Sequence, residues 1–283
     1  MKVILFFNNQ RGLSILNSLA KKNVDVKFIF FSKKNLNAKI FQKVLKQKIP
    51  SLKVININSH RVEKIIKKIQ PDLNIVAGFP YLINKKIYKI PKYGTVNLHA
   101  GKLPEYRGGS PLNWQIINGE KKIGISLIEL NQKLDAGKII CSKEFELKKD
   151  YDIKKVHELA NKYFISLTFE AINKLLKNKN FKKQNIKKAK YWRQRKESDG
   201  LLDFKNMSDI SVYNFVRAIT KPYPCAFINI KGKKMKIIKC KIYNKNLDIY
   251  PGQIFYVKKR VFLGCKEGII EVIKYQYENS KYA

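Results

Sequence analysis

The stretch KVILFFNNQRGLSILNSLAKKNVDVKFIFF, residues 2–31, sets the pattern from which the fold can be inferred. An apolar run at 2–7 is followed by a segment whose apolar residues have helical spacing, and then by a second apolar run at 24–31. Strands that are apolar throughout are buried on both faces, and strands that alternate with helices form parallel sheets. This pattern therefore predicts an α/β protein.

The alternation continues to residue 99. Helical patterns and apolar runs take turns, with Ser59 as a candidate N-cap and Pro71 as a helix stop. Further strands are expected at 52–57, 73–79 and 94–99. The fold class predicted is a Rossmann-like, mostly parallel sheet with helices on both faces. Only Gly12 follows the first strand, so the three-glycine dinucleotide fingerprint is absent, which argues against NAD.

The second half of the chain changes character. Two more strands are expected at 123–130 and 137–147, then a long amphipathic helix at 151–178. A lysine-rich segment at 178–192 has the composition of a linker. One helix and five short strands follow, at 209–220, 225–230, 234–243, 252–257, 260–265 and 268–277. We therefore expect two domains, residues 1–182 and a small mainly-β, OB-like domain at 183–283.

Composition narrows the class of protein. The chain has 283 residues and a net charge of +38, with the lysine excess spread along its length. Spread lysine indicates a solvated surface set by codon bias, whereas a nucleic-acid stripe should be clustered; both interpretations stay open here. No apolar run approaches the roughly 20 residues of a membrane helix. Four scattered cysteines fit reduced thiols in a cytoplasmic protein, and no set of residues has metal-ligand spacing.

A polar constellation follows the strand at 94–99. Asn97 and His99 are two residues apart in an extended segment, so they face the same side. Asp135 lies in a loop between two later strands, before Gly137. Ligands of open α/β sheets lie beyond the carboxyl ends of the strands. An oxyanion donor, an imidazole and a carboxylate are the parts needed for acyl transfer to an amine, although a single histidine at a strand end is also typical of a structural residue.

The segment NLHAGKLPEYRGGSPLNWQIINGE, followed by GISLIELNQKLDAGKII, resembles the formyltransferases that use N10-formyltetrahydrofolate. The family pattern is Asn-x-His, then Leu-Pro-x-x-Arg-Gly, then Leu-Asp-x-Gly. The matching residues here are Asn97, His99, Leu103, Pro104, Arg107, Gly108, Leu134, Asp135 and Gly137. The resemblance implies that Asn97 stabilises the oxyanion, that His99 manages proton transfer, and that Asp135 either orients His99 or accepts the amine proton through water.

The resemblance also implies a folate site. Its pteridine would lie against the loop after the fourth strand and beside the aspartate loop. The residues implied are Gly78, Phe79, Pro80, Tyr81, Leu82, Leu103, Pro104, Arg107, Ile128 and Leu130. For Phe79 and Tyr81 ordinary loop packing is the alternative. For Arg107 the alternative is to brace the loop.

The acceptor substrate is inferred from details of the same likeness. Gly101 and Lys102 replace the family's usual serine and leucine before Leu-Pro, and Lys102, with Arg193 and Arg195, is a candidate for phosphate contact. The segments YWRQRKESDGLLDF and FVRAITKPYPCAF are similar to the start of the smaller domain of methionyl-tRNA formyltransferases. They are closer to the bacterial enzymes that formylate nucleotide-linked 4-amino sugars for lipopolysaccharide or capsule.

Several expectations about partners follow from that likeness. The short loop after the second strand argues against tRNA, the acceptor of the related methionyl-tRNA formyltransferases. A non-enzymatic RNA-binding protein is a third hypothesis. The terminal strands offer an edge through which a homodimer could form. The expected partners are thus folate and a nucleotide-linked amino sugar, with no membrane.

Overall fold

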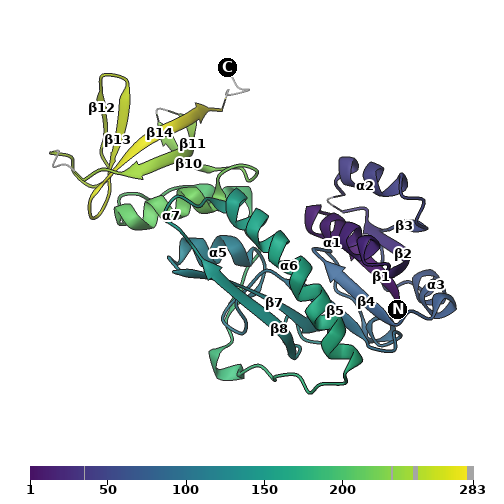
Figure 1. Cartoon of the computed structure of the whole chain (residues 1–283). Coiled ribbons are helices and arrows are strands. Elements are labelled where there is room, and N and C mark those ends of the chain that lie inside the picture. The colour runs from purple at the N-terminus through teal and green to yellow at the C-terminus, as the bar shows by residue number, and fades with distance from the viewer. Residues whose placement is uncertain (35, 231, 245–247, 279–283) are drawn as a thin grey trace. The chain divides into compact units, whose positions relative to one another are not determined.

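The computed structural model describes residues 1–34, 36–230, 232–244 and 248–278 (Figure 1). The chain divides into two compact units. The first comprises residues 1–108, 124–144 and 159–191, and the second comprises residues 109–123, 145–158 and 192–283. Each unit is described separately below.

The larger sheet has seven strands in the order β3-β2-β1-β4-β5-β7-β8. The strands are β1 (Lys2–Phe7), β2 (Asp25–Ser32), β3 (Ser51–Val54), β4 (Leu73–Ala77), β5 (Thr95–His99), β7 (Lys122–Glu129) and β8 (Ile139–Glu146). The pairs from β3 to β5 are parallel, and β7 pairs antiparallel with β5. The predicted mostly parallel sheet is confirmed. β3 ends three residues before the expected end of its strand.

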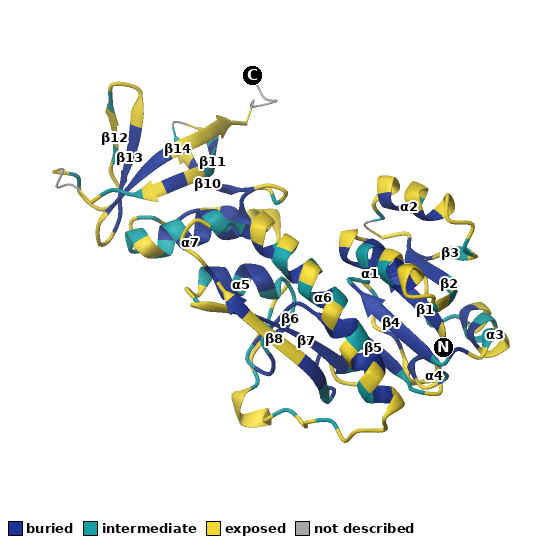
Figure 2. Ribbon diagram, viewed as in Figure 1, coloured by how far each residue is buried: buried dark blue, intermediate teal, exposed yellow. Residues whose placement is uncertain are grey.

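Helices cover both faces of this sheet. They are α1 (Gln10–Lys21), α2 (Ala38–Leu45), α3 (His60–Ile69), α4 (Lys85–Tyr88) and α6 (Ile153–Leu176). Residues of α3 and α4 join the core cluster that contains Ile4, Phe6 and Phe30. On the other face, Gly12 of α1 lies against the ring of Phe7, because a Cβ at Gly12 would come within 2.1 Å of that ring. The strands between these layers are buried, as Figure 2 shows for β1 and β4.

The register of the sheet brings the ends of β4 and β5 together, with β7 alongside β5. Val76 of β4 pairs with Asn97 of β5, and Asn97 pairs in turn with Ile128 of β7. The loop after β4 therefore leaves the sheet beside the end of β5. Because β7 is antiparallel to β5, its last residue, Glu129, pairs with Val96, and the loop after β7 begins beside the start of β5. The edge formed by the ends of β4 and β5 is where an open α/β sheet places its ligands.

The lysine-rich segment after α6 is not a free linker. It forms a short 3-10 helix, η1 (Ile186–Lys188), and a two-residue strand, β9 (Tyr191–Trp192), which pairs with β6 (Arg107–Gly108). Its side chains are mostly exposed, but its backbone is bonded to the loops of the first unit. Main-chain pairing of this kind leaves no hydrophobic period in the sequence, so composition alone indicated a linker.

The second unit contains the C-terminal sheet. Its helices are α5 (Pro111–Ile117), η2 (Glu197–Gly200) and α7 (Asp209–Ile219), and its strands are β10 (Ala226–Ile230), β11 (Lys233–Ile242), β12 (Ile254–Val257), β13 (Arg260–Gly264) and β14 (Ile269–Tyr277). The strands pair antiparallel in the order β10-β11-β14-β13-β12. The predicted mainly-β character of this part is confirmed.

Candidate active site

Three polar side chains from separate parts of the chain meet at the end of β5. Asn97 and His99 belong to β5, and Asp135 comes from the loop between β7 and β8. Nδ2 of Asn97 donates to Oδ1 of Asp135 at 3.4 Å, and Nδ1 of His99 lies 3.4 Å from Oδ2 of the same carboxylate. The structure therefore brings together the three residues that the sequence singled out.

Asp135 is the centre of this cluster. Its Oδ2 also accepts a hydrogen bond from the backbone N–H of Gly108 at 2.9 Å, so the Leu-Pro-x-x-Arg-Gly turn takes part in holding the carboxylate. Asp135 is buried, and its backbone has a φ of 48°, in the left-handed region that side chains other than glycine rarely adopt. A carboxylate presented from an unfavourable backbone conformation must be held by its surroundings.

Both ring nitrogens of His99 face protein groups. Nε2 lies 2.6 Å from the backbone carbonyl oxygen of Tyr106. A carbonyl oxygen only accepts hydrogen bonds, so Nε2 carries a hydrogen and donates it. Nδ1 then faces Asp135, and the side chain is only 6% exposed. This geometry fixes the ring and directs its remaining nitrogen at the carboxylate.

Gly101 lies against this imidazole. A Cβ at position 101 would come within 2.5 Å of both Nε2 of His99 and the Tyr106 carbonyl oxygen. The position predicted to bind substrate is thus buried beside the histidine. Its neighbour Lys102 forms an ion pair of 3.2 Å with Glu144, and both side chains are about 40% exposed.

The loop predicted to hold the pteridine follows β4 directly. Phe79 lies edge-on to Phe6, with ring centroids 5.8 Å apart, and Tyr81 lies edge-on to Phe79 at 5.5 Å. Leu82 next to them is 71% exposed. Among the other predicted contacts, Ile128 is buried in β7 and Leu130 is half-buried against the same core cluster. Gly78 and Pro80 complete the loop.

The turn that contains Leu103 and Pro104 is buried, and so is Arg107. The guanidinium of Arg107 donates from Nε and Nη2 to Oε1 of Gln184 at 3.0 and 2.7 Å, and from Nη1 to the Tyr191 hydroxyl at 2.9 Å. These contacts are those of a residue that braces loops. Contact of Arg107 with folate stays a prediction.

Arg193 and Arg195 belong to the second unit. Arg193 forms an ion pair with Asp199, and this hydrogen bond, with a second from the Lys196 backbone, lowers the pKa of Asp199 to about 2. The guanidinium of Arg195 lies 4.8 Å from the ring centre of Trp114 and 5.0 Å from that of Phe215. Phosphate contact by the two arginines stays a prediction.

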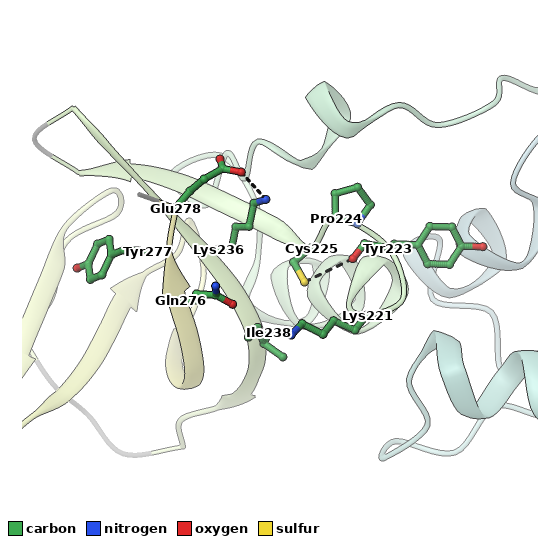
Figure 3. A pocket seen from close by; sticks show the side chains of 9 residues that line it. All are labelled: Lys221, Tyr223, Pro224, Cys225, Lys236, Ile238, Gln276, Tyr277 and Glu278. Atoms are coloured by element: carbon green, nitrogen blue, oxygen red, sulfur yellow. Dashed lines mark hydrogen bonds and ion pairs between the residues drawn. The ribbon is translucent and has the colours of Figure 1, made fainter. Parts of the chain in front are cut away.

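A separate hollow lies in the second unit, between the turn after α7 and the strands β11 and β14 (Figure 3). Its volume is about 370 Å³. The lining residues are Lys221, Tyr223, Pro224, Cys225, Lys236, Ile238, Gln276, Tyr277 and Glu278. Lys236 is bonded to Glu278 at 2.7 Å, and the Tyr223 hydroxyl is bonded to His157 Nε2 at 2.9 Å. Tyr223 thus stacks on a histidine within its own unit.

Sequence reasoning missed two residues of the active site. The carbonyl of Tyr106 and the side chain of Gln184 both act by hydrogen bonding across loops, and neither position carries a signal in the sequence. Within the described ranges, no group of three or more histidine, cysteine or acidic residues could hold a metal ion. No helix in the same ranges is both long enough and apolar enough to cross a bilayer.

Comparison with known proteins identifies relatives of both parts of the chain. The formyl transferase family matches residues 1–168, and the C-terminal domain of formyl transferases matches residues 195–283. The methionyl-tRNA formyltransferase of Thermodesulfovibrio yellowstonii is 33% identical over 206 residues, which are 73% of this chain and 66% of that protein. The bifunctional polymyxin resistance protein ArnA of Wigglesworthia glossinidia brevipalpis is 33% identical over 287 residues, or 98% of this chain and 43% of that protein.

The fold is also that of a solved relative. The N-formyltransferase from Helicobacter canadensis, solved in complex with folinic acid and dTDP-3-aminofucose, superimposes with a TM-score of 0.75 at 17% identity and covers 98% of this chain and 100% of that one. This chain spans from under half to about two thirds of the length of the two relatives found by sequence. The family predicted from the sequence is confirmed: the chain belongs to the formyl transferase family.

Proposed function

We propose that the protein transfers a formyl group from N10-formyltetrahydrofolate to the amine of a nucleotide-linked amino sugar. The observation that carries this proposal is the convergence of Asn97, His99 and Asp135 at the end of β5. An amide and an imidazole, each 3.4 Å from one carboxylate, supply an oxyanion donor and a proton acceptor in one place.

The three side chains take different roles. When bound, the folate supplies the formyl carbon, and its N10 is the leaving group. Asn97 has a second amide hydrogen beyond the one directed at Asp135, and it donates to the formyl oxygen as negative charge develops there. The acceptor amine forms the new C–N bond and loses a proton, which Asp135 accepts directly or through water. Asp135 then gives that proton to the leaving nitrogen as the old C–N bond breaks. With its hydrogen on Nε2, His99 presents the lone pair of Nδ1 to Asp135, and it accepts a hydrogen bond from the carboxyl group once that group has taken up the proton.

The loop after β4 fits a flat, partly apolar ring system. Phe79, Tyr81 and Leu130 are half-buried on the core, so one side of each remains accessible, and the exposed Leu82 adds an apolar side chain beside them. The sheet register places this loop next to Asn97. These residues would therefore hold the pteridine ring of the folate. Ligand sites of this kind are mostly apolar with a few placed polar groups.

Two observations favour an amino sugar as the acceptor. The structure of the H. canadensis enzyme matches along the full length of both chains, and that protein was solved with a nucleotide-linked amino sugar. Only residues 33–37 separate β2 from α2, which leaves no room for a long inserted loop there. Specificity in such enzymes depends on the loops that surround a shared site. Phosphate contacts by Lys102, Arg193 and Arg195, a domain boundary between 182 and 183, a homodimer and a cytoplasmic location stay predictions.

The second candidate is methionyl-tRNA formyltransferase. It is favoured by the T. yellowstonii relative and by the net charge of +38, which would attract RNA. The chemistry at Asp135 would be the same. The two candidates differ only in the acceptor.

A parallel assay separates the two acceptors. The protein is incubated with N10-formyltetrahydrofolate and either a panel of dTDP- and UDP-linked amino sugars or charged initiator tRNA. We expect a mass increase of one carbonyl group on at least one sugar nucleotide, and no such product with the Asp135→Asn variant. Formylation of the tRNA alone would reverse the choice of acceptor. Formylation of neither would refute the proposed function.

A further inference from the structure

Residues 182–191, here called the strap, run along the two loops that build the active site. At one end, the carbonyl oxygen of Lys182 accepts from the N–H of Ile139 at 2.9 Å, where β8 begins. At the other end, Lys190 donates to the carbonyl oxygen of Pro104 at 3.2 Å and accepts from the N–H of Arg107 at 3.0 Å. The main chain of the strap is thus bonded to the turn that contains Arg107 and to the start of β8, which follows the Asp135 loop.

Gln184 lies in the middle of the strap and uses both ends of its amide. Nε2 donates to the backbone carbonyl oxygens of Asp135 and Gly137, at 2.8 and 2.7 Å. Oε1 accepts from Nε and Nη2 of Arg107, at 3.0 and 2.7 Å. Two carbonyl acceptors on one side and a guanidinium on the other fix which end of the amide is nitrogen. One side chain therefore joins the arginine turn to the aspartate loop.

Gln184 bonds the backbone of the Asp135 loop at a residue with an unfavourable conformation. Asp135 has its φ at 48°, and the residues before it, 131–134, are exposed. The amide of Gln184 binds the carbonyl groups of Asp135 and Gly137, on both sides of Ala136. Arg107 is only 4% exposed, and its third donor group goes to Tyr191, also in the strap. Loss of Gln184 would leave a buried guanidinium and two carbonyls without these partners.

We propose that Gln184 is a positioning residue: it holds the backbone of Asp135 so that the carboxylate stays on His99 and Asn97. The inference rests on the proposed function, because it concerns the alignment of the proton acceptor. A small displacement of a catalytic group lowers turnover strongly and affects substrate binding little. The side chain itself touches the loop backbone and Arg107, so it acts through Asp135.

The test compares Gln184→Leu with a matched control. Gln184→Leu keeps the approximate shape and removes both hydrogen-bonding ends. Asn185→Ala changes the adjacent strap residue, whose side chain is exposed and, among the described residues, bonds only the nearby N–H of Lys187. We expect kcat for formyl transfer to fall about 10- to 100-fold in Gln184→Leu, with KM for donor and acceptor within about twofold. Asn185→Ala should match the wild type.

A second background separates positioning from general damage to the fold. In the Asp135→Asn background, Gln184→Leu should lower kcat no further, because the group that it positions is already lost. A wild-type kcat for Gln184→Leu would overturn the inference. So would a fall in kcat of equal size in both backgrounds.

Hydrogen exchange gives a readout that does not depend on any acceptor. The N–H of Gly108 is bonded to the Asp135 carboxylate, so its protection reports the position of that carboxylate. We expect faster exchange in peptides that contain Gly108 and residues 133–138 in Gln184→Leu, and no change in Asn185→Ala. Unchanged exchange would overturn the inference. Faster exchange without formylation of any acceptor would refute the proposed function and leave the inference intact.

Discussion

Nε2 of His99 donates a hydrogen bond to the backbone carbonyl oxygen of Tyr106 at 2.6 Å, and this contact determines how the imidazole is used. Nε2 is engaged by its hydrogen bond to Tyr106, so Nδ1, which faces Asp135, is the ring nitrogen left to exchange a proton. We therefore expect the histidine to act through the carboxylate. We expect the carboxylate to be the group that takes the proton of the acceptor amine.

Asp135→Asn should lower kcat for formyl transfer by about 10²- to 10⁴-fold, the range typical of a lost general base. The amide of asparagine keeps an oxygen that can accept from Gly108, so we expect the fold to persist. Initial rates measure the loss, and thermal unfolding followed by circular dichroism provides the control. A variant that turns over at the wild-type rate would remove Asp135 from the mechanism.

Gly101→Ala should lower kcat because its Cβ would wedge between His99 and Tyr106. Gly94→Ala is the matched control: its φ of 73° makes alanine costly there, by roughly 1–2 kcal/mol, yet a Cβ at Gly94 would meet nothing within 4 Å. Both variants lose stability, and only Gly101→Ala should lose turnover. Equal rates in the two variants would show that the histidine does not need its contact with Tyr106.

Asn74→Val should stabilise the protein. Asn74 is fully buried in β4, and both polar atoms of its side chain lack a hydrogen-bond partner among the described residues. A buried, unpaired amide costs about 1–3 kcal/mol, which an apolar side chain avoids. We expect a higher urea midpoint of unfolding. Asn8→Val, at a buried asparagine with three hydrogen bonds to Ser32 and Lys34, should lower it. A shift in the same direction for both variants would contradict the argument.

The ionised carboxylate of Glu271 should stabilise the protein at neutral pH and lose that effect in acid. Arg260 binds its carboxylate through two hydrogen bonds of 2.8 Å, and this contact, with Lys241, lowers the pKa of Glu271 from 4.5 to about 2. A lowered pKa in the folded state stabilises the protein above the ordinary value, and that stabilisation is lost as the pH falls from about 4.5 to about 2. Glu271→Gln should therefore be less stable than the wild type at pH 7, with the difference shrinking below pH 4.5.

Urea unfolding at pH 7, 4 and 2.5 measures this difference. Glu146→Gln, at an exposed position, is the control and should follow the wild type at each pH. A difference between wild type and Glu271→Gln that stayed constant across the three pH values would rule out the ion pair as its source.

The cysteine thiols should resist reaction with thiol reagents in the folded protein. All four cysteines are free and buried, and burial raises the pKa of Cys141, Cys240 and Cys265 to about 12. The thiolate is the reactive form, so we expect almost no reaction with a disulfide reagent at pH 8. Unfolding in guanidinium should expose all four thiols to the reagent. Rapid labelling of any thiol before unfolding would contradict the buried placement.

The sequence predicts the sheet well because its strands are buried on both faces and therefore apolar throughout, as at residues 2–7. It fails where polar contacts replace burial. The strand expected at 52–57 ends at Val54, since Asn56 turns the chain by accepting from the N–H of Asn58. The positions of Asn97, His99 and Asp135 at strand ends and in a loop made them candidates, the family likeness supported them, and only the fold shows that they meet. Gln184 carries no pattern at all, because its role consists of four hydrogen bonds to distant loops.

The strap also bears on how this enzyme can be divided. The match to the formyl transferase family ends at residue 168. Two later residues nevertheless support the site: Gln184 bonds the backbone of the Asp135 loop, and Tyr191 bonds the guanidinium of Arg107. A truncated version that ends at residue 168 would keep every residue of the sequence motif but would lose the hydrogen bonds that Gln184 and Tyr191 make to the motif loops. Engineers who transplant or swap this half between enzymes should place their junction beyond residue 191.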